Sequence, residues 1–216
     1  KKDSFEYRFR DSIDTNKSSP LVLMIHGYGS NEDDLFSFAR LLPENYKIVS
    51  LRAPYSLPYG GFSWYDINLD DSSNIKINIS QAKDSILKIK DFVENELKNK
   101  ISFDINNICL IGFSQGTILS YALSLNYPNL FKRIIALSGK INMDLIDEVV
   151  KDYSSLKFFC SHGITDQVIP VNFSRESISW LKSQNISHTY KEYDMAHSVN
   201  QKNFYDLIDW MKLNLK

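Results

Sequence analysis

Short, mainly apolar runs alternate with longer amphipathic stretches along the chain. Each run is four or five residues long, which is typical of strands that helices cover on both faces. The predicted strands of this kind are Leu21–Ile25, Lys47–Leu51, Ile108–Ile111, Ile134–Leu137 and Lys157–Ser161. Near the start, Phe5–Phe9 alternates apolar and polar positions and predicts a half-exposed edge strand, and a last strand is expected at His188–Tyr193.

Segments with apolar residues at helical spacing separate these strands. They predict helices at 31–42, 78–97, 117–127, 173–184 and 201–215, and a short helix at Met143–Val150. Strands and helices therefore alternate through the 216 residues, which favours one α/β domain with a mostly parallel sheet and helices on both faces. In such a sheet the functional side chains lie at the carboxyl ends of the strands.

Residues 52–77 interrupt this alternation with an irregular stretch that contains two prolines and two glycines. Loops of this length in compact domains are usually functional or disordered. Its aromatic residues argue against disorder: Tyr55, Tyr59, Phe62, Trp64 and Tyr65. They fit either the core or the wall of a substrate pocket, because pocket walls are themselves mostly apolar and aromatic.

Composition excludes several classes of partner. The formal net charge is −1, from 25 basic and 26 acidic residues, so no strong field directs the chain to nucleic acid or an anionic membrane. No stretch is apolar enough to span a bilayer, and the first residues lack the apolar region of a signal peptide, which favours a cytoplasmic location. Cys109 and Cys160 each fall in an apolar run, so no disulfide framework is expected. The histidines lack metalloprotease spacing, and we expect no metal and no other cofactor.

The segment Gly112-Phe113-Ser114-Gln115-Gly116 lies between a predicted strand and a predicted helix. The pattern G-x-S-x-G in this context is typical of the nucleophile elbow of α/β-hydrolases. There the serine sits in a strained turn, and the glycines let the strand and the helix approach each other. The alternative is a glycine-rich turn with a serine that has no chemical role.

A serine hydroxyl is a weak nucleophile unless a base takes its proton, and the base needs an acid to fix its tautomer. In this fold the acid and then the base follow the serine along the chain. Asp166 and His197 appear in that order, and each directly follows a predicted strand. Loops at one edge of the sheet would then bring both side chains to Ser114.

The other candidates for acid and base rank lower. His26 and His162 each precede a glycine at a strand end, where we expect them to order loops. His188 opens a strand and is expected to be structural, and Asp194 has no strand end of its own.

Ester hydrolysis also needs N–H donors for the oxyanion that develops on the substrate carbonyl. In this fold one donor is the backbone N–H after the nucleophile, here Gln115, and the other comes from the loop after an early strand. The stretch His26-Gly27-Tyr28-Gly29 occupies that place, and the N–H of Tyr28 is the best candidate. The alternative is that these glycines only make a tight turn.

With these residues the chain resembles the carboxylesterase/phospholipase family, which includes acyl-protein thioesterases and small bacterial esterases. The matching stretches run in family order over nearly the whole chain: His26-Gly27-Tyr28-Gly29, Arg52-Ala53-Pro54, Ser63-Trp64-Tyr65-Asp66, Gly112-Phe113-Ser114-Gln115-Gly116, His162-Gly163-Ile164-Thr165-Asp166 with Val168 and Pro170, and His197. The resemblance implies an α/β-hydrolase fold, a triad of Ser114, Asp166 and His197, and oxyanion donors at Tyr28 and Gln115. The chain departs from the family where Tyr28 replaces a small or aliphatic residue and Ala196 replaces a glycine.

The resemblance also implies that the loop with Phe62 and Trp64 walls the acyl site. Ile164, Val168 and Met195 flank the two triad loops, and we expect them to line the acyl side. The expected reaction is hydrolysis of a carboxylic ester through an acyl-enzyme, on a small-molecule or lipid-like acyl ester. A lysophospholipase or acyl-protein thioesterase is the alternative within this class, and a non-catalytic binding module on a hydrolase fold is the alternative outside it.

Overall fold

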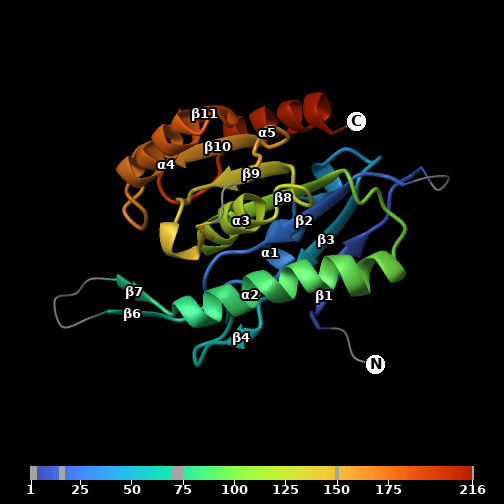
Figure 1. Cartoon of the computed structure of the whole chain (residues 1–216), viewed down its shortest axis with the longest axis horizontal. Coiled ribbons are helices and arrows are strands. Elements are labelled where there is room, and N and C mark those ends of the chain that lie inside the picture. The colour runs from blue at the N-terminus through green and yellow to red at the C-terminus, as the bar shows by residue number, and fades with distance from the viewer. Residues whose placement is uncertain (1–3, 15–17, 70–74, 149–150, 216) are drawn as a thin grey trace.

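A seven-stranded sheet forms the centre of the computed structural model, which describes residues 4–14, 18–69, 75–148 and 151–215 (Figure 1). The strand order is β1-β3-β2-β8-β9-β10-β11. These strands are β1 (Tyr7–Arg10), β2 (Leu21–Ile25), β3 (Lys47–Leu51), β8 (Ile108–Phe113), β9 (Arg133–Leu137), β10 (Lys157–Gly163) and β11 (Ser187–Tyr193). Only β1 is antiparallel to its neighbour within this described sheet. The seven strands predicted from the sequence are therefore confirmed, although the first begins at Tyr7 instead of Phe5.

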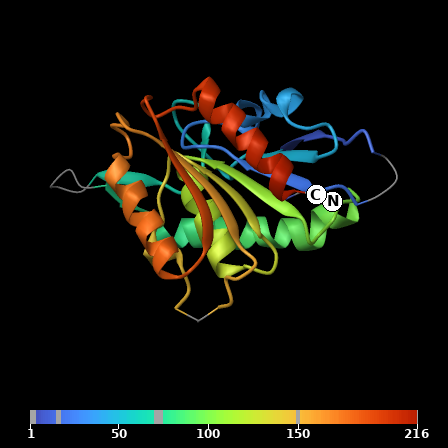
Figure 2. The same cartoon turned by 90° about the horizontal axis from the view of Figure 1, so that it is seen from above.

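Helices cover both faces of this sheet (Figure 2). The helices α2 (Ile79–Asp91), α3 (Gln115–Asn126) and α4 (Val171–Ser183) lie on one face, and α1 (Glu32–Phe36) and α5 (Gln201–Asn214) lie on the other. A hydrophobic core lies on each face of the sheet. Alternate residues of β2 pack into one core or the other, because successive side chains of a strand point to opposite faces. The predicted α/β layering is confirmed. No helix among the described residues is both long and apolar enough to cross a bilayer.

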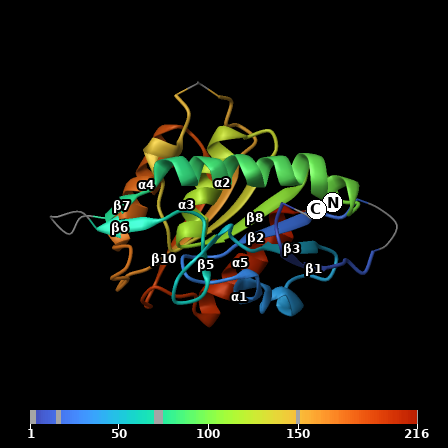
Figure 3. The same ribbon diagram turned by 90° about the horizontal axis from the view of Figure 1, so that it is seen from below.

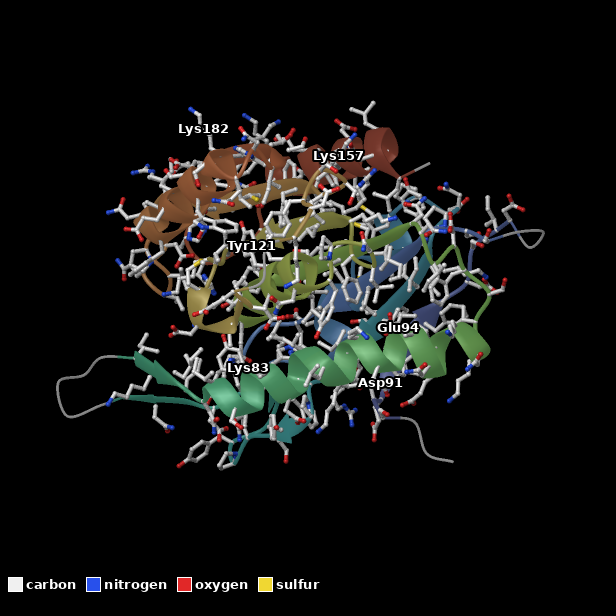
Figure 4. All side chains as sticks on the ribbon, viewed as in Figure 1. Lys83, Asp91, Glu94, Tyr121, Lys157 and Lys182 are labelled. Carbon is white, nitrogen blue, oxygen red and sulfur yellow. The ribbon has the colours of Figure 1, made fainter. Side chains whose placement is uncertain are left out.

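Every residue of α3 is buried, which explains why its sequence contains no charged residue. Figure 4 shows its Tyr121 in the middle of the molecule, between the elements that carry the labelled lysines and acids. The Tyr121 hydroxyl donates to the Cys160 Sγ atom at 3.2 Å. Burial raises the pKa of the Cys160 thiol to about 12, so this cysteine is not a thiolate nucleophile at neutral pH.

The helix predicted at 31–42 is wrong in extent. It splits into α1 and a 3₁₀ turn at Ala39–Leu41. The Ser37 hydroxyl donates to the carbonyl of Asp34 at 2.7 Å, and such a local bond competes with the continuing helical ladder. The helix predicted at 78–97 is correct, and its last turns change to π geometry at Phe92–Glu96 and to 3₁₀ geometry at Leu97–Asn99.

The short helix predicted at Met143–Val150 is also wrong. Its described part contains one 3₁₀ turn, Met143–Leu145, and residues 149–150 lie outside the described residues. The N–H of Asp147 donates to the Asn126 side chain at 2.9 Å, which draws the backbone to the end of α3 instead of continuing a helix. The hydrogen bond to Asn126 therefore takes the place of the backbone hydrogen bond that would have continued the helix.

The stretch 52–77 is more regular than expected. It contains two short antiparallel hairpins, β4 (Tyr55–Ser56) with β5 (Phe62–Ser63) and β6 (Ile67–Leu69) with β7 (Ile75–Ile77). Figure 3 shows β6 and β7 extending away from the body beside the start of α2. The first hairpin turns through Gly60 and Gly61, whose φ angles of +97° and +76° favour glycine. It then carries the chain back past the loop that follows β2, where Ser30 and Phe62 form a β-bridge.

Candidate active site

Ser114 lies in the sharp turn between β8 and α3, with a φ of +55°. This conformation is strained for a residue with a side chain. The flanking glycines allow the close approach that the turn needs. A Cβ on Gly116 would lie 1.9 Å from the Ile25 carbonyl oxygen, and one on Gly112 would lie 2.6 Å from the Gly116 carbonyl oxygen. The strand-turn-helix context predicted from the sequence is confirmed.

The structure brings together the three side chains that the sequence pointed to. Ser114 Oγ lies 2.9 Å from His197 Nε2, and His197 Nδ1 lies 2.6 Å from Asp166 Oδ2. A carboxylate only accepts hydrogen bonds, so Nδ1 carries the proton of the neutral ring and Nε2 is free to accept the serine proton. The three residues follow β8, β10 and β11 at one edge of the sheet.

The Asp166 side chain has no exposed surface and is surrounded by donors. Its Oδ1 accepts the N–H groups of Val168 and Ile169, both at 2.9 Å. Its Oδ2 accepts the hydrogen bond from His197 Nδ1 and also lies 3.3 Å from His162 Nε2. These donors hold the carboxylate in one orientation.

The loop that carries the acid and the loop that carries the base are bonded to each other. The N–H of Ile164 donates to the Tyr193 carbonyl at 2.9 Å. The backbone N–H and the hydroxyl of Thr165 both donate to the Met195 carbonyl, at 3.2 and 3.0 Å. The His197 ring also packs against Phe113, with centroids 5.0 Å apart. The Asp166–His197 geometry is thus set in the free protein, with only 17% of the His197 side chain exposed.

The two expected oxyanion donors face no protein acceptor within the described residues. Gln115 is the first residue of α3, where a helix leaves its N–H groups unpaired, and Tyr28 lies in the turn after β2. Gly27 borders the serine, because a Cβ on it would lie 3.4 Å from Ser114 Cβ. Unpaired N–H groups beside the serine, with the positive end of α3, make a place suited to a developing negative charge.

Trp64 is placed differently from the expectation that it walls the acyl site. Its side chain has no exposed surface and belongs to the core. Its indole N–H donates to the His26 carbonyl at 2.8 Å, and its backbone N–H donates to Gln115 Oε1 at 2.8 Å. Gln115 Nε2 in turn donates to the Tyr65 carbonyl at 2.9 Å. Trp64 therefore joins the loop after β2 to the start of α3, and its indole is not on an open wall.

The other expected substrate-binding residues divide into two groups. Ile164 and Val168 are exposed beside the acid loop, by 50% and 61%, and the Tyr28 side chain is 45% exposed. Met195 is instead buried, and its sulfur accepts the N–H of Asn200 at 3.4 Å, so it supports the His197 loop from within. Phe62 is half-buried beneath the Arg52 guanidinium, which lies 4.7 Å from its ring centroid.

The expectation that His26 and His162 order loops is confirmed by their contacts. His162 Nε2 donates to the Ile169 carbonyl at 2.7 Å, within the acid loop. His26 accepts the N–H of Ala53 and contacts the Gly27 carbonyl, and burial lowers its pKa, which keeps the ring neutral at neutral pH. His188 bonds the Ile186 carbonyl beside β11.

One ion pair near the site was missed from the sequence. Arg52 donates twice to the buried carboxylate of Glu32, at 2.8 and 2.5 Å, and these bonds lower the Glu32 pKa. The same guanidinium covers Phe62, whose backbone pairs with Gly29 and Ser30. The pair joins residues that are far apart in the sequence, and the stretch Arg52-Ala53-Pro54 was the only sequence signal for it. Among the described residues, no group of three or more His, Cys, Asp or Glu side chains is placed to hold a metal ion.

Comparison with known proteins identifies the family of the chain. The sequence profile of the phospholipase/carboxylesterase family matches residues 13–215. The chain is 27% identical over 225 residues to a probable carboxylesterase SOBER1-like protein of Arabidopsis thaliana, with 97% of this chain and 82% of that protein covered. It is 24% identical over 212 residues to acyl-protein thioesterase 1 of Kluyveromyces lactis, with 91% and 92% covered.

Solved structures of low sequence identity share the fold. Esterase PE8 superposes with a TM-score of 0.84 at 21% identity and covers 98% of this chain and 99% of its own. The Bacillus cereus carboxylesterase superposes with a TM-score of 0.82 at 20% identity and covers 98% and 95%. A family profile that spans nearly the whole chain, on this fold, means that the protein is an enzyme of the phospholipase/carboxylesterase family of α/β-hydrolases.

Proposed function

We propose that the protein is a serine esterase that cleaves carboxylic esters through an acyl-enzyme. Ser114 is the nucleophile, His197 the general base and acid, and Asp166 the group that orients His197. The observation that carries the proposal is the continuous hydrogen-bonded chain from Ser114 Oγ through His197 to Asp166. The N–H groups of Tyr28 and Gln115 hold the oxyanion.

In the acylation half, Ser114 Oγ attacks the ester carbonyl while its proton passes to His197 Nε2. The carbonyl oxygen becomes an oxyanion and accepts hydrogen bonds from Tyr28 and Gln115. The imidazolium that forms is stabilised by the Asp166 carboxylate. The tetrahedral intermediate then collapses, the bond to the leaving oxygen breaks, and His197 gives the proton from Ser114 to that oxygen, which departs as the alcohol.

In the deacylation half, water takes the place of the alcohol. His197 Nε2 accepts a proton from this water, whose oxygen attacks the acyl-enzyme carbonyl. Collapse of the second intermediate releases the carboxylic acid, and His197 protonates Ser114 Oγ. The serine proton leaves with the alcohol and a proton from the water replaces it on Ser114 Oγ, so the enzyme ends the cycle unchanged.

The substrate is an acyl ester whose apolar part contacts an open rim. The exposed apolar side chains of Tyr28, Ile164 and Val168 support this substrate class. An acyl-protein thioesterase is the second candidate, favoured by the similarity to acyl-protein thioesterase 1 of Kluyveromyces lactis. Turnover of matched oxygen esters and thioesters with the same acyl chain, over a series of chain lengths, separates the two. A cytoplasmic location and a single domain stay predictions from the sequence.

Replacement of the nucleophile tests the proposal. Ser114→Ala is expected to lower kcat for p-nitrophenyl acetate by about 10⁴-fold or more, because the remaining groups cannot form an acyl-enzyme. A fluorophosphonate probe should label the wild-type chain at Ser114 and leave the variant unlabelled. Near wild-type turnover by the variant would contradict the mechanism, and a wild-type chain that the probe does not label would support a binding module without catalysis.

A further inference from the structure

We propose that His26 is a positioning residue for the oxyanion hole, because it fixes the Gly27–Tyr28 peptide so that the Tyr28 N–H points at the reacting carbonyl. The inference rests on the proposed function, in which the Tyr28 N–H is an oxyanion donor. His26 itself is buried and does not contact the substrate. It acts through the backbone of the next two residues.

The two ring nitrogens of His26 have different partners, and these determine the tautomer. Nε2 lies 3.0 Å from the N–H of Ala53, which only donates, so Nε2 carries no proton. Nδ1 therefore carries the proton of the neutral ring and donates to the Gly27 carbonyl oxygen at 2.7 Å. The side chain is fully buried at the end of β2, and both nitrogens are paired. The ring can make these two bonds in only one orientation.

The bond to Gly27 determines where the Tyr28 N–H points. The Gly27 C=O and the Tyr28 N–H belong to one planar peptide, and in a trans peptide they point in opposite directions. The Gly27 oxygen accepts Nδ1–H of His26 and also the N–H of Ser30 at 3.2 Å. Two donors on the oxygen fix the plane of the peptide. The N–H on the other side is left without a protein acceptor in the described part of the chain, beside Ser114.

His26 is also tied to the second oxyanion donor. Its carbonyl accepts the Trp64 indole N–H at 2.8 Å, and the rings of the two residues lie 5.4 Å apart at 40°. The backbone N–H of Trp64 donates to the Gln115 side chain. A continuous set of hydrogen bonds thus runs from the Gly27–Tyr28 peptide to the residue whose own N–H is the other donor. This connection sets the spacing between the two N–H groups before substrate binds.

The two bonds of His26 can be removed separately. In His26→Asn the amide nitrogen takes the place of Nδ1 and keeps the donor to Gly27, while the acceptor for Ala53 is lost. In His26→Gln the amide oxygen takes the place of Nε2 and keeps the acceptor for Ala53, while the donor to Gly27 is lost. If His26 only stabilises the loop, both bonds matter and both variants should be affected. If His26 positions the Tyr28 N–H, activity depends on the bond to Gly27.

The experiment measures kcat, KM and the melting temperature of both variants, with p-nitrophenyl acetate as substrate. Loss of one oxyanion donor costs about 10²- to 10³-fold in kcat, so a misdirected donor in His26→Gln should lower kcat roughly 10- to 100-fold with little change in KM. His26→Asn should keep kcat within about threefold of the wild type even where its melting temperature falls. The rate of fluorophosphonate labelling should follow kcat, because the phosphoryl oxygen occupies the same hole. His188→Gln is the matched control, since His188 bonds Ile186 beside β11 away from the triad, and its kcat should not change.

Equal losses of kcat in the Asn and Gln variants, in proportion to their melting temperatures, would overturn the inference. If His26→Gln does not fold, His26→Asn decides alone, because a loss of kcat of about tenfold or more there would overturn it as well. The failure of the proposed function looks different. In that case Ser114→Ala would keep wild-type turnover, whatever the His26 variants do.

Discussion

Gly163→Ala tests whether the bonded acid and base loops set the catalytic geometry. A Cβ at this position would lie 2.1 Å from the Ala196 carbonyl oxygen and 2.3 Å from that of Met195. Both are backbone atoms, so no side-chain rotation relieves the contact. Ordinary van der Waals contact begins at 3.4 Å, so the two loops must separate by 3.4 − 2.1 = 1.3 Å or more. A displacement of about 1 Å can already cost about 10²-fold in rate. The expected fall in kcat/KM corresponds to about 2.7 kcal/mol of transition-state stabilisation.

The measurement pairs activity with stability. Turnover of p-nitrophenyl acetate gives kcat/KM, and urea unfolding gives the free energy of unfolding, which overpacking should lower by about 1–3 kcal/mol. Gly60→Ala is the control, because a Cβ there meets nothing within 4 Å and its φ of +97° still strains an alanine. The control should lose about 1–3 kcal/mol of stability and keep its activity. Wild-type kcat/KM in Gly163→Ala, with the stability loss present, would refute the idea that loop spacing controls the rate.

Two further changes test the acid and the buried ion pair. Asp166→Asn should lower kcat about 10⁴-fold in steady-state assays, because an amide nitrogen facing Nδ1 favours the wrong tautomer of His197, and a smaller effect than tenfold would argue against its role. Glu32→Gln should lower the free energy of unfolding by about 2 kcal/mol near pH 7, since Arg52 loses a charged partner. The Glu32 pKa is lowered in the folded protein from its usual 4.5, so the stability from this pair is present above that pH and lost as the pH falls below it. Urea unfolding of wild type and variant should therefore converge in acid, and a constant difference down to about pH 3 would contradict the pairing.

The sequence predicted the parts of the fold that depend on burial patterns. Strands such as β2 and β8 are apolar runs because both faces are covered, and that signal is local. The helices predicted at 31–42 and Met143–Val150 were wrong because single side-chain hydrogen bonds redirect the backbone. These bonds involve the side chains of Ser37 and Asn126. Such bonds leave no trace in hydrophobic periodicity. Tertiary contacts therefore affect where a helix ends more than whether the helix forms.

Within the site, chain order placed Ser114, Asp166 and His197 because parallel strands deliver their carboxyl ends to one edge. The burial of Trp64 could not be read in the same way. An aromatic residue in a long loop suits a pocket wall and a core equally well, and only its contacts with His26 and Gln115 decide. The pair of Arg52 and Glu32 was missed for a similar reason, since the stretch Arg52-Ala53-Pro54 marks the end of β3 but does not identify a partner at the start of α1.

The site is built from two hydrogen-bonded units that meet at Ser114. One unit joins the loops after β10 and β11 and holds Asp166 against His197. The other joins the loop after β2 to the start of α3 and holds the two N–H groups that we propose as oxyanion donors. Because each unit has its own set of bonds, damage to one should leave the geometry of the other intact. Losses of rate from Gly163→Ala and His26→Gln should then arise from different interactions with the same transition state, the first from proton transfer to His197 and the second from stabilisation of the oxyanion.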